Sequence, residues 1–161
     1  MSAISKNHAA VIGAGPAGLA AANDLALLGY SCTIFESNAT PGGMLRMGVP
    51  PYRLPRKAID NDVEFIKKLG VEIQYNTTLG TDITFDRLEK DGFAVIFIGV
   101  GLLESRTLNI EGVQLEGVLK GVSFLHEVNT TGSARIGKNV LVIGGGAVAM
   151  NAKRLLELYE K

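Results

Sequence analysis

The 161-residue sequence predicts an α/β fold in which helices flank a parallel sheet. Short apolar runs alternate with stretches at helical spacing, as expected for strands joined by helical crossovers. Two such runs end in glycine clusters, at 13–18 and 144–146, and each cluster is followed by a helical pattern. With 47% apolar residues and 16 acidic against 16 basic side chains, the chain can bury a real core.

The first three elements form one unit. His8–Ile12 reads as a strand buried on both faces, because it is uniformly apolar. Pro16–Leu28 is rich in Ala and Leu and is closed by a glycine, which predicts a helix. Ser31–Phe35 is a second short strand. A strand, a helix and a strand in about 30 residues are typical of a βαβ unit in a Rossmann-like parallel sheet.

The middle of the chain adds a loop and further elements. Residues Thr40–Pro55 form a long irregular segment, and a loop of that length in a compact domain is usually functional. After it, the pattern predicts a helix over Ala58–Leu69, a strand over Val71–Tyr75, a short helix over Phe85–Lys90 and a central strand over Phe93–Ile98.

The last third is less regular. Gly121–Val128 is predicted to be helical. Asn139–Ile143 repeats the opening pattern, since this apolar run is predicted to be a strand leading into three glycines and a helix over Ala147–Tyr159. The two strand, glycine and helix units form a weak internal repeat.

Composition excludes several classes of function. Zero net charge without a basic run argues against a nucleic-acid or anionic-membrane binder. The longest apolar stretch, Phe93–Leu103, is too short to span a bilayer. Glycines interrupt the early apolar run, so a secretory signal is disfavoured. The single cysteine, Cys32, excludes an internal disulfide, a four-thiolate zinc site and an iron–sulfur cluster made by this chain alone, and a cytoplasmic location is expected.

The first glycine cluster has the spacing G-x-G-x-x-G between a predicted strand and a helix. Gly13 permits the tight turn, Gly15 lets the backbone approach a pyrophosphate, and Gly18 lets the helix pack closely on the strand. The helix N-terminus offers unpaired N–H groups to phosphates. Glu36 follows the second strand, where a carboxylate accepts both hydroxyls of an adenosine ribose. The alternative is a glycine turn needed only for packing beside a solvated carboxylate.

The segment 41–55 carries two cationic side chains, Arg46 and Arg53, among its glycines and prolines. Two interpretations stay open from the residues alone: a rigid loop along a bound cofactor, or a proline-rich surface loop with solvated arginines. His8 and His126 lack a partner at triad spacing, so no catalytic side chain is predicted.

Taken together, Gly13–Gly18, Glu36, Gly42-Gly43-Met44 and Tyr52-Arg53-Leu54-Pro55 resemble the FAD-binding region of the glutamate synthase small (beta) subunit family. That family includes the flavin part of dihydropyrimidine dehydrogenase and related ferredoxin–NADP oxidoreductase subunits. The segments 97–101, 108–112 and 124–129 are similar to the strand, turn and helix that follow in the family, and 140–151 looks like the start of its NAD(P)H domain. The chain departs from the family at Glu111, where the family usually has a proline before glycine, and at Ala147 and Asn151, where it usually has Asn and Asp.

The resemblance implies a role for each matched position. The FAD pyrophosphate and ribose would be held by Gly13, Ala14, Gly15, Pro16, Ala17, Gly18 and Glu36. Gly43, Met44 and Arg53 would lie on the flavin side, Leu79 near the adenine, and Gly99 and Gly101 in the strand-and-turn segment. Gly144, Gly146 and Ala149 would form the nicotinamide fingerprint, and no metal site is implied.

The expected architecture is that of a flavoprotein with two dinucleotide-binding domains, in truncated form: residues 1–136 as the FAD-binding half and 137–161 as the first strand and helix of an incomplete NAD(P)-binding domain. The expected function is an oxidoreductase that passes electrons from NAD(P)H through FAD to a partner, such as an iron–sulfur or glutamate synthase large subunit. A nucleotide-binding module without turnover, and a plain NAD-dependent dehydrogenase or Rossmann-type regulator, are the alternatives. Unpaired apolar surface near residues 139–143 predicts self-association.

Overall fold

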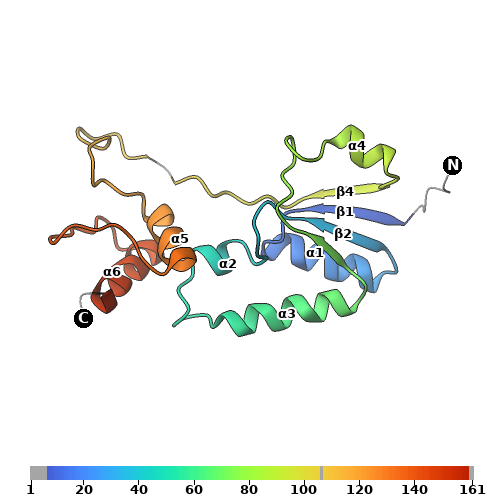
Figure 1. Ribbon diagram of the computed structural model, residues 1–161, viewed down its shortest axis with the longest axis horizontal. Helices are drawn as coiled ribbons and strands as arrows, with labels where there is room; N and C mark the ends of the chain where they lie inside the picture. Colours follow the sequence, from blue (N-terminus) through green and yellow to red (C-terminus); the bar gives the residue numbers. More distant parts are fainter. Residues whose placement is uncertain (1–6, 106, 160–161) are drawn as a thin grey trace. The chain divides into compact units, whose positions relative to one another are not determined.

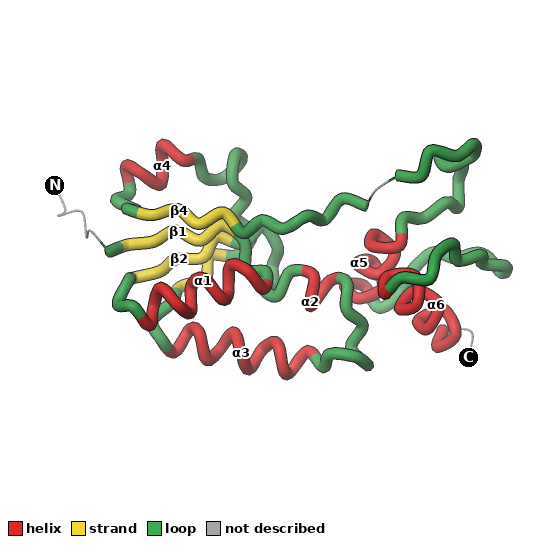
Figure 2. The backbone as a smooth tube through the Cα atoms, turned by 180° about the vertical axis from the view of Figure 1, so that it is seen from behind, coloured by secondary structure: helices red, strands yellow, loops and turns green. Residues whose placement is uncertain are grey.

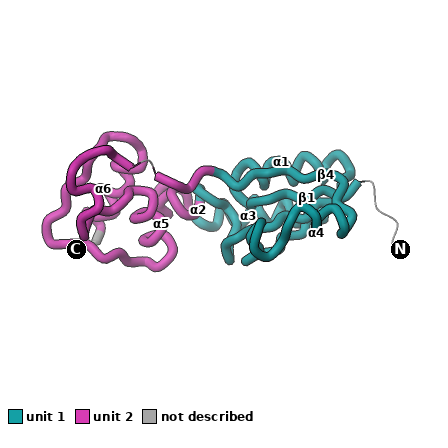
Figure 3. Tube along the Cα trace, turned by 90° about the horizontal axis from the view of Figure 1, so that it is seen from above, with its two compact units in different colours: residues 1–45, 56–101 teal, residues 46–55, 102–161 magenta. Residues whose placement is uncertain are grey.

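The computed structural model describes residues 7–105 and 107–159 and divides into two compact units. Unit 1 comprises residues 1–45 and 56–101, and unit 2 comprises residues 46–55 and 102–161 (Figure 3). Each unit therefore contains two separate segments of the sequence.

Unit 1 is built on a four-stranded sheet in the order β3-β2-β1-β4 (Figure 1). The strands are β1 (His8–Ile12), β2 (Ser31–Phe35), β3 (Glu72–Gln74) and β4 (Val95–Ile98), and every pairing is parallel. The chain goes from β1 to β2 on one side, and β4 returns to the other side of β1. The carboxyl end of β1 is thus a topological switch point, where open α/β sheets bind ligands. The predicted α/β fold with a parallel sheet is confirmed.

Helices flank this sheet. They are α1 (Pro16–Leu27), α3 (Arg56–Lys68) and the short α4 (Phe85–Lys90) (Figure 2). β1 is buried on both faces, because its side chains alternate between two layers. Ala10 and Ile12 pack in a core cluster with Leu88 of α4, whereas Val11 lies beside Gly18 of α1. The central strand thereby fixes where α1 begins.

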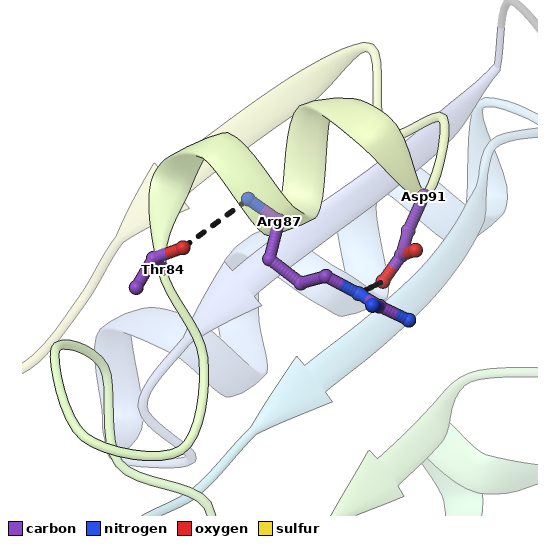
Figure 4. A network of polar contacts seen from close by, with 3 residues as sticks. All are labelled: Thr84, Arg87 and Asp91. Carbon is purple, nitrogen blue, oxygen red and sulfur yellow. Dashed lines mark hydrogen bonds and ion pairs between the residues drawn. The ribbon is translucent and has the colours of Figure 1, made fainter.

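The start of α4 is held by its own side chains (Figure 4). Thr84 is the N-cap residue, and its Oγ1 accepts a hydrogen bond from the backbone N–H of Arg87 at 3.2 Å. Arg87 Nε lies 2.8 Å from Asp91 Oδ2, an exposed ion pair of the helix-surface kind. These contacts explain why so short a helix forms where the sequence predicts it.

The sequence predicts that the strand over Phe93–Ile98 is central. In the structure it is the edge strand β4, so this prediction is wrong. Within the described residues its outer side has no neighbouring strand, and Ile98 keeps 58% of its surface exposed although the run is wholly apolar. Apolar composition alone cannot separate a central strand from an edge strand.

Unit 2 has its core between two helices, α5 (Gly121–Thr131) and α6 (Ala147–Tyr159). Phe124, Leu125 and Val128 of α5 pack against Ala152, Leu155 and Leu156 of α6. Gly132, in the left-handed conformation, ends α5. A four-residue helix, α2 (Met44–Met47), interrupts the long loop that the sequence predicts as irregular.

The predicted strand over 139–143 is wrong. These residues have no strand structure, and Val140, Leu141 and Ile143 are 48%, 84% and 69% exposed. A strand needs a partner for its backbone groups, and the described part of unit 2 contains none.

Candidate functional site

The glycine turn after β1 is closed by contacts that leave no room for side chains. A Cβ added to Gly18 would lie 1.8 Å from the carbonyl oxygen of Gly13, and one added to Gly13 would lie 2.6 Å from that of Gly99. Gly13 also has a φ of +99°, a conformation that favours glycine. The structure thus brings together three predicted site residues from β1, α1 and the end of β4.

A second pair of glycines lies against this turn. A Cβ added to Gly43 would approach Gly15 Cα to 2.9 Å, and the N–H of Gly42 donates to the carbonyl of Ala14 at 2.7 Å. A Cβ added to Gly15 would meet only Gly43 Cα, at 4.0 Å. The backbone of Gly15 is therefore open to approach, as a pyrophosphate requires.

The amide groups of the turn divide into two sets. The N–H of Gly13 donates to Phe35 O at 2.8 Å, and that of Ala14 donates to Glu36 Oε2 at 2.6 Å. By contrast, the N–H groups of Gly15 and Ala17 have no acceptor among the described residues. Pro16, the first helical residue, has no N–H. Free amide donors at the positive end of α1, those of Gly15 and Ala17 among them, can accommodate an anion.

Glu36 is the buried polar group of the site. Only 4% of its surface is exposed, directly after β2. Its backbone extends the sheet, because its N–H donates to Gln74 O at 2.8 Å and its carbonyl accepts from Thr77 N at 2.9 Å. Its carboxylate accepts from Ala14, as above, and from the backbone N–H and Nδ2 of Asn38 at 2.8 and 2.7 Å. The carboxylate thus joins the glycine turn to the loop that follows β2.

The remaining predicted residues of unit 1 lie in different surroundings. Leu79 is half-buried and packs on the cluster that contains Phe35 and Leu88. Met44 begins α2, directly after Gly43. Gly101 has a positive φ, but a Cβ there would meet nothing within 4 Å. The compact cluster is therefore formed by the glycines at 13, 15, 18, 43 and 99 together with Ala14 and Glu36.

Arg53 belongs to unit 2, where it contacts α6. Its Nη1 donates to Oδ1 of Asn151, a residue only 7% exposed, at 3.2 Å. From α5, Nδ2 of Asn129 donates to the carbonyl of Met47 at 2.8 Å. Two asparagines, one from each packed helix, thus hold the segment 46–55 at two points. In the described part of the chain no carboxylate pairs with Arg53, so its charge is not neutralised.

The second glycine cluster differs from the first. Gly144 has a φ of +118°, and its nearest neighbour is Ala149, whose Cβ would lie 3.6 Å from a Cβ at this glycine. A Cβ added to Gly146 would meet nothing within 4 Å. The turn leads into α6 as predicted, but it does not follow a strand.

Other features of the described residues lie apart from this site. A recess of about 340 Å³ beside α4, lined by Phe35, Gln74, Asp82, Ile83, Arg87, Leu88, Asp91 and Phe93, contains none of the predicted cofactor residues. Burial raises the pKa of the Cys32 thiol, which indicates an inert side chain. Within 7–105 and 107–159, no three His, Cys, Asp or Glu side chains gather as metal ligands, and no helix is long and apolar enough to cross a bilayer.

Sequence reasoning missed two of these asparagines, Asn38 and Asn129. Asn38 lies two residues beyond Glu36, and an Asn just after a strand commonly bonds to nearby backbone and polar groups. That local signal was available in the sequence. The contact of Asn129 with Met47 spans 82 residues, and no local pattern predicts it.

Comparison with known proteins connects this arrangement to redox enzymes. Residues 7–157 match the sequence profile described as pyridine nucleotide-disulphide oxidoreductase. The chain is 45% identical over 153 residues to the NADP(+)-dependent formate dehydrogenase subunit beta of Moorella thermoacetica, covering 93% of this chain and 22% of that protein.

Two further relatives carry the predicted resemblance. One is the NAD-dependent dihydropyrimidine dehydrogenase subunit PreT of Escherichia coli K12, 39% identical over 150 residues, which are 92% of this chain and 36% of that protein. The other is a putative glutamate synthase [NADPH] small chain of Cereibacter sphaeroides, 35% identical over 153 residues, 89% of this chain and 37% of that protein. The resemblance drawn from the motifs is confirmed.

The fold has a counterpart among solved structures. A 2-naphthoyl-CoA reductase complex superimposes with a TM-score of 0.75 and 27% identity, over 95% of this chain and 22% of that one. The chain therefore spans between about a fifth and two fifths of the length of these relatives.

Proposed function

Because the chain belongs to the pyridine nucleotide-disulphide oxidoreductase family, we propose that it is the FAD-binding part, with the start of the nicotinamide-binding part, of an NAD(P)H oxidoreductase. When bound, FAD supplies the hydride and electron transfer, and the protein supplies position and electrostatics. The observation that carries the proposal is the buried carboxylate of Glu36 bonded to the glycine turn.

The residues of unit 1 fit an adenine dinucleotide. The free N–H groups of Gly15 and Ala17 would donate to the pyrophosphate, helped by the dipole of α1. Gly15 has no side chain to block that approach. Glu36 would accept from the adenosine ribose. Gly13, Gly18 and Gly99 hold the turn in shape, and Ala14 links it to Glu36.

The finer assignment is the glutamate synthase small-subunit type. Met44 and Arg53 would serve the flavin side, Leu79 the adenine, and Gly144, Gly146 and Ala149 the nicotinamide cofactor. Residues 1–136 and 137–161 would belong to the two dinucleotide-binding domains. Relatives named as a beta subunit and a small chain support a partner subunit that takes the electrons, of the iron–sulfur or large-subunit kind. A cytoplasmic location and self-association through the exposed residues 139–143 complete this proposal.

Reconstitution with FAD tests the proposal. The purified chain should become yellow with added FAD, retain the colour after desalting and release FAD on denaturation. Glu36→Gln, which removes the charge and leaves the shape, should weaken FAD binding by about 10-fold or more, as expected when a charged hydrogen-bond acceptor is lost. A colourless wild-type protein with a native melting transition would refute FAD binding.

One observation favours a second function, a nucleotide-binding module without turnover: residues 139–143, before the second glycine cluster, have no strand structure. NAD(P)H-dependent reduction of a dye by the FAD-loaded chain separates the two. Turnover by this chain alone eliminates the module. FAD binding without dye reduction supports it.

A further inference from the structure

We infer that Asn38 is a second ribose-recognition residue beside Glu36, so that the two side chains together select a nucleotide with a free 2′,3′-diol. This inference rests on the proposed binding of an adenine dinucleotide in unit 1. It adds a specificity residue that the glycine motif and its carboxylate do not contain.

The carboxylate of Glu36 has little hydrogen-bonding capacity left for a ligand. Each carboxylate oxygen offers about two acceptor positions. Both positions of Oε1 are taken by Asn38, through its backbone N–H at 2.8 Å and its Nδ2 at 2.7 Å, and Ser37 Oγ adds a long contact at 3.4 Å. From the residues that the structure describes, Oε2 accepts only the N–H of Ala14, at 2.6 Å. One good position, on Oε2, is left for a ligand.

An adenosine ribose requires acceptors for two hydroxyl groups. Its 2′ and 3′ hydroxyls are two donors on adjacent carbons, and the carboxylate as it is bonded here has room for one of them. Glu36 can therefore accept both hydroxyls only if its 2.7 Å hydrogen bond to Asn38 is lost. If that bond stays, the second hydroxyl needs another acceptor nearby.

The orientation of the Asn38 side chain leaves its amide oxygen available as an acceptor. Because Nδ2 donates to the carboxylate, the amide oxygen Oδ1 is directed away from Oε1. Oδ1 has no donor among the described residues, and it is not one of the buried unsatisfied atoms, so it reaches solvent. The backbone carbonyl of Asn38 accepts from Asn76 N at 3.2 Å, which fixes the residue next to β3. Asn38 Oδ1 is thus an acceptor held beside Glu36.

The arrangement also defines the ligand by chemistry. Glu36 Oε2 and Asn38 Oδ1 are both acceptors, so they bind two hydroxyl donors. A 2′-phosphate presents only acceptors and negative charge, and it would meet a carboxylate. The site is therefore built for adenosine nucleotides of the FAD or NAD type and against those with a 2′-phosphate.

Titration calorimetry tests this inference by measuring the affinities of the protein for ADP, 2′-deoxy-ADP and 3′-deoxy-ADP. Asn38→Ala should weaken ADP binding about 5-fold to 10-fold, the effect of one lost hydrogen bond with its positioning. In this variant, removing the hydroxyl that Asn38 binds should no longer weaken binding. One deoxy compound should therefore bind the variant as tightly as ADP does, while the other should still bind more weakly than ADP, by the same factor as in the wild type. ADP with a 2′-phosphate should bind the wild type about 10-fold or more weakly than ADP.

Thr40→Ala is the matched control, because Thr40 is exposed in the same loop and should leave all four affinities unchanged. If Asn38→Ala does not fold, Asn38→Ser gives the same comparison with a shorter side chain. An ADP affinity unchanged by the Asn38 variant, or two deoxy penalties that both persist in it, overturns the inference and leaves the proposed function intact. A folded wild-type chain that binds no ADP overturns the proposed function and this inference with it.

Discussion

The two glycine clusters of this chain share a spacing and differ in their surroundings. The first, at 13–18, follows β1, touches Gly99 after β4 and is bonded to a buried carboxylate. The second, at 144–146, opens α6 from a segment without strand structure, and two of its glycines have open space around them. The same glycine spacing thus gives a closely packed turn where a sheet holds both sides of it and an open one where no strand precedes it.

The third position of each fingerprint shows the same contrast. Gly18 is packed against the carbonyl of Gly13, whereas the corresponding residue of the second cluster is Ala149. The first turn therefore depends on the absence of a methyl group, and the second already contains one.

The largest effect should come from placing that methyl group in the first turn. Gly18→Ala puts a Cβ 1.8 Å from a backbone oxygen, so the helix must move, and we expect a loss of about 3 kcal/mol or more in the free energy of unfolding. Gly146→Ala, with nothing within 4 Å, should change it by less than about 0.5 kcal/mol. Urea denaturation measures both. Equal losses in the two variants would erase the contrast between the clusters.

The next effect concerns the buried carboxylate of Glu36 beside the first cluster. Glu36→Ala leaves the buried N–H of Ala14 without an acceptor and removes the partner of Asn38, which should cost about 2 to 3 kcal/mol of unfolding free energy. Glu127→Ala, an exposed glutamate on α5, is the control and should be nearly neutral. If Glu36→Ala lowered the free energy of unfolding by less than about 0.5 kcal/mol, the stability of the turn would not depend on this bond.

A smaller effect is expected in unit 2, where Asn151 holds Arg53. A double-mutant cycle with Arg53→Ala and Asn151→Ala should give a coupling energy of about 1 kcal/mol, the value of one partly buried hydrogen bond. Asn151→Asp should strengthen the contact, because the acceptor becomes charged. Thermal unfolding without any cofactor supplies the measurement, and additive single losses would show that the contact contributes nothing.

The smallest effect is a pH dependence confined to unit 1. Burial raises the pKa of Cys32 above its ordinary value of 9.0, so the folded state binds the thiol proton more tightly than the unfolded state does. Stability should therefore be unaffected well below pH 9 and should fall as the pH rises past that value. Unfolding at pH 7.5 and pH 10 in wild type and Cys32→Ala isolates this contribution, and an identical pH response in both proteins would contradict it.

Much of unit 1 is readable from local sequence. β1 and β2 have the predicted bounds, as does α4, because an apolar run between turn residues and a Thr N-cap are local signals. The close packing of Gly13 and Gly18 follows from the motif, which specifies both spacing and supersecondary context, whereas the bond from Ala14 to Glu36 was not predicted.

The errors arise where the outcome depends on distant partners. The segment 139–143 has the composition of a strand but no neighbouring strand, and β4 is apolar yet lies at an edge. The contacts of Asn151 with Arg53 and of Asn129 with Met47 join residues 98 and 82 positions apart, and neither is encoded in a local pattern. Side-chain bonds of this kind require the assembled tertiary structure.

The hydrogen bond from Gly42 to Ala14 makes one backbone proton a reporter of the turn. Its two ends are separated by α1 and β2, so the bond exists only while that whole unit is assembled. Deuterium uptake at Gly42 should accordingly track the opening of the glycine turn at 13–18, and a ligand that closes the turn should slow this uptake more than uptake at the ends of α1. A single exchange rate would then measure how often this turn opens.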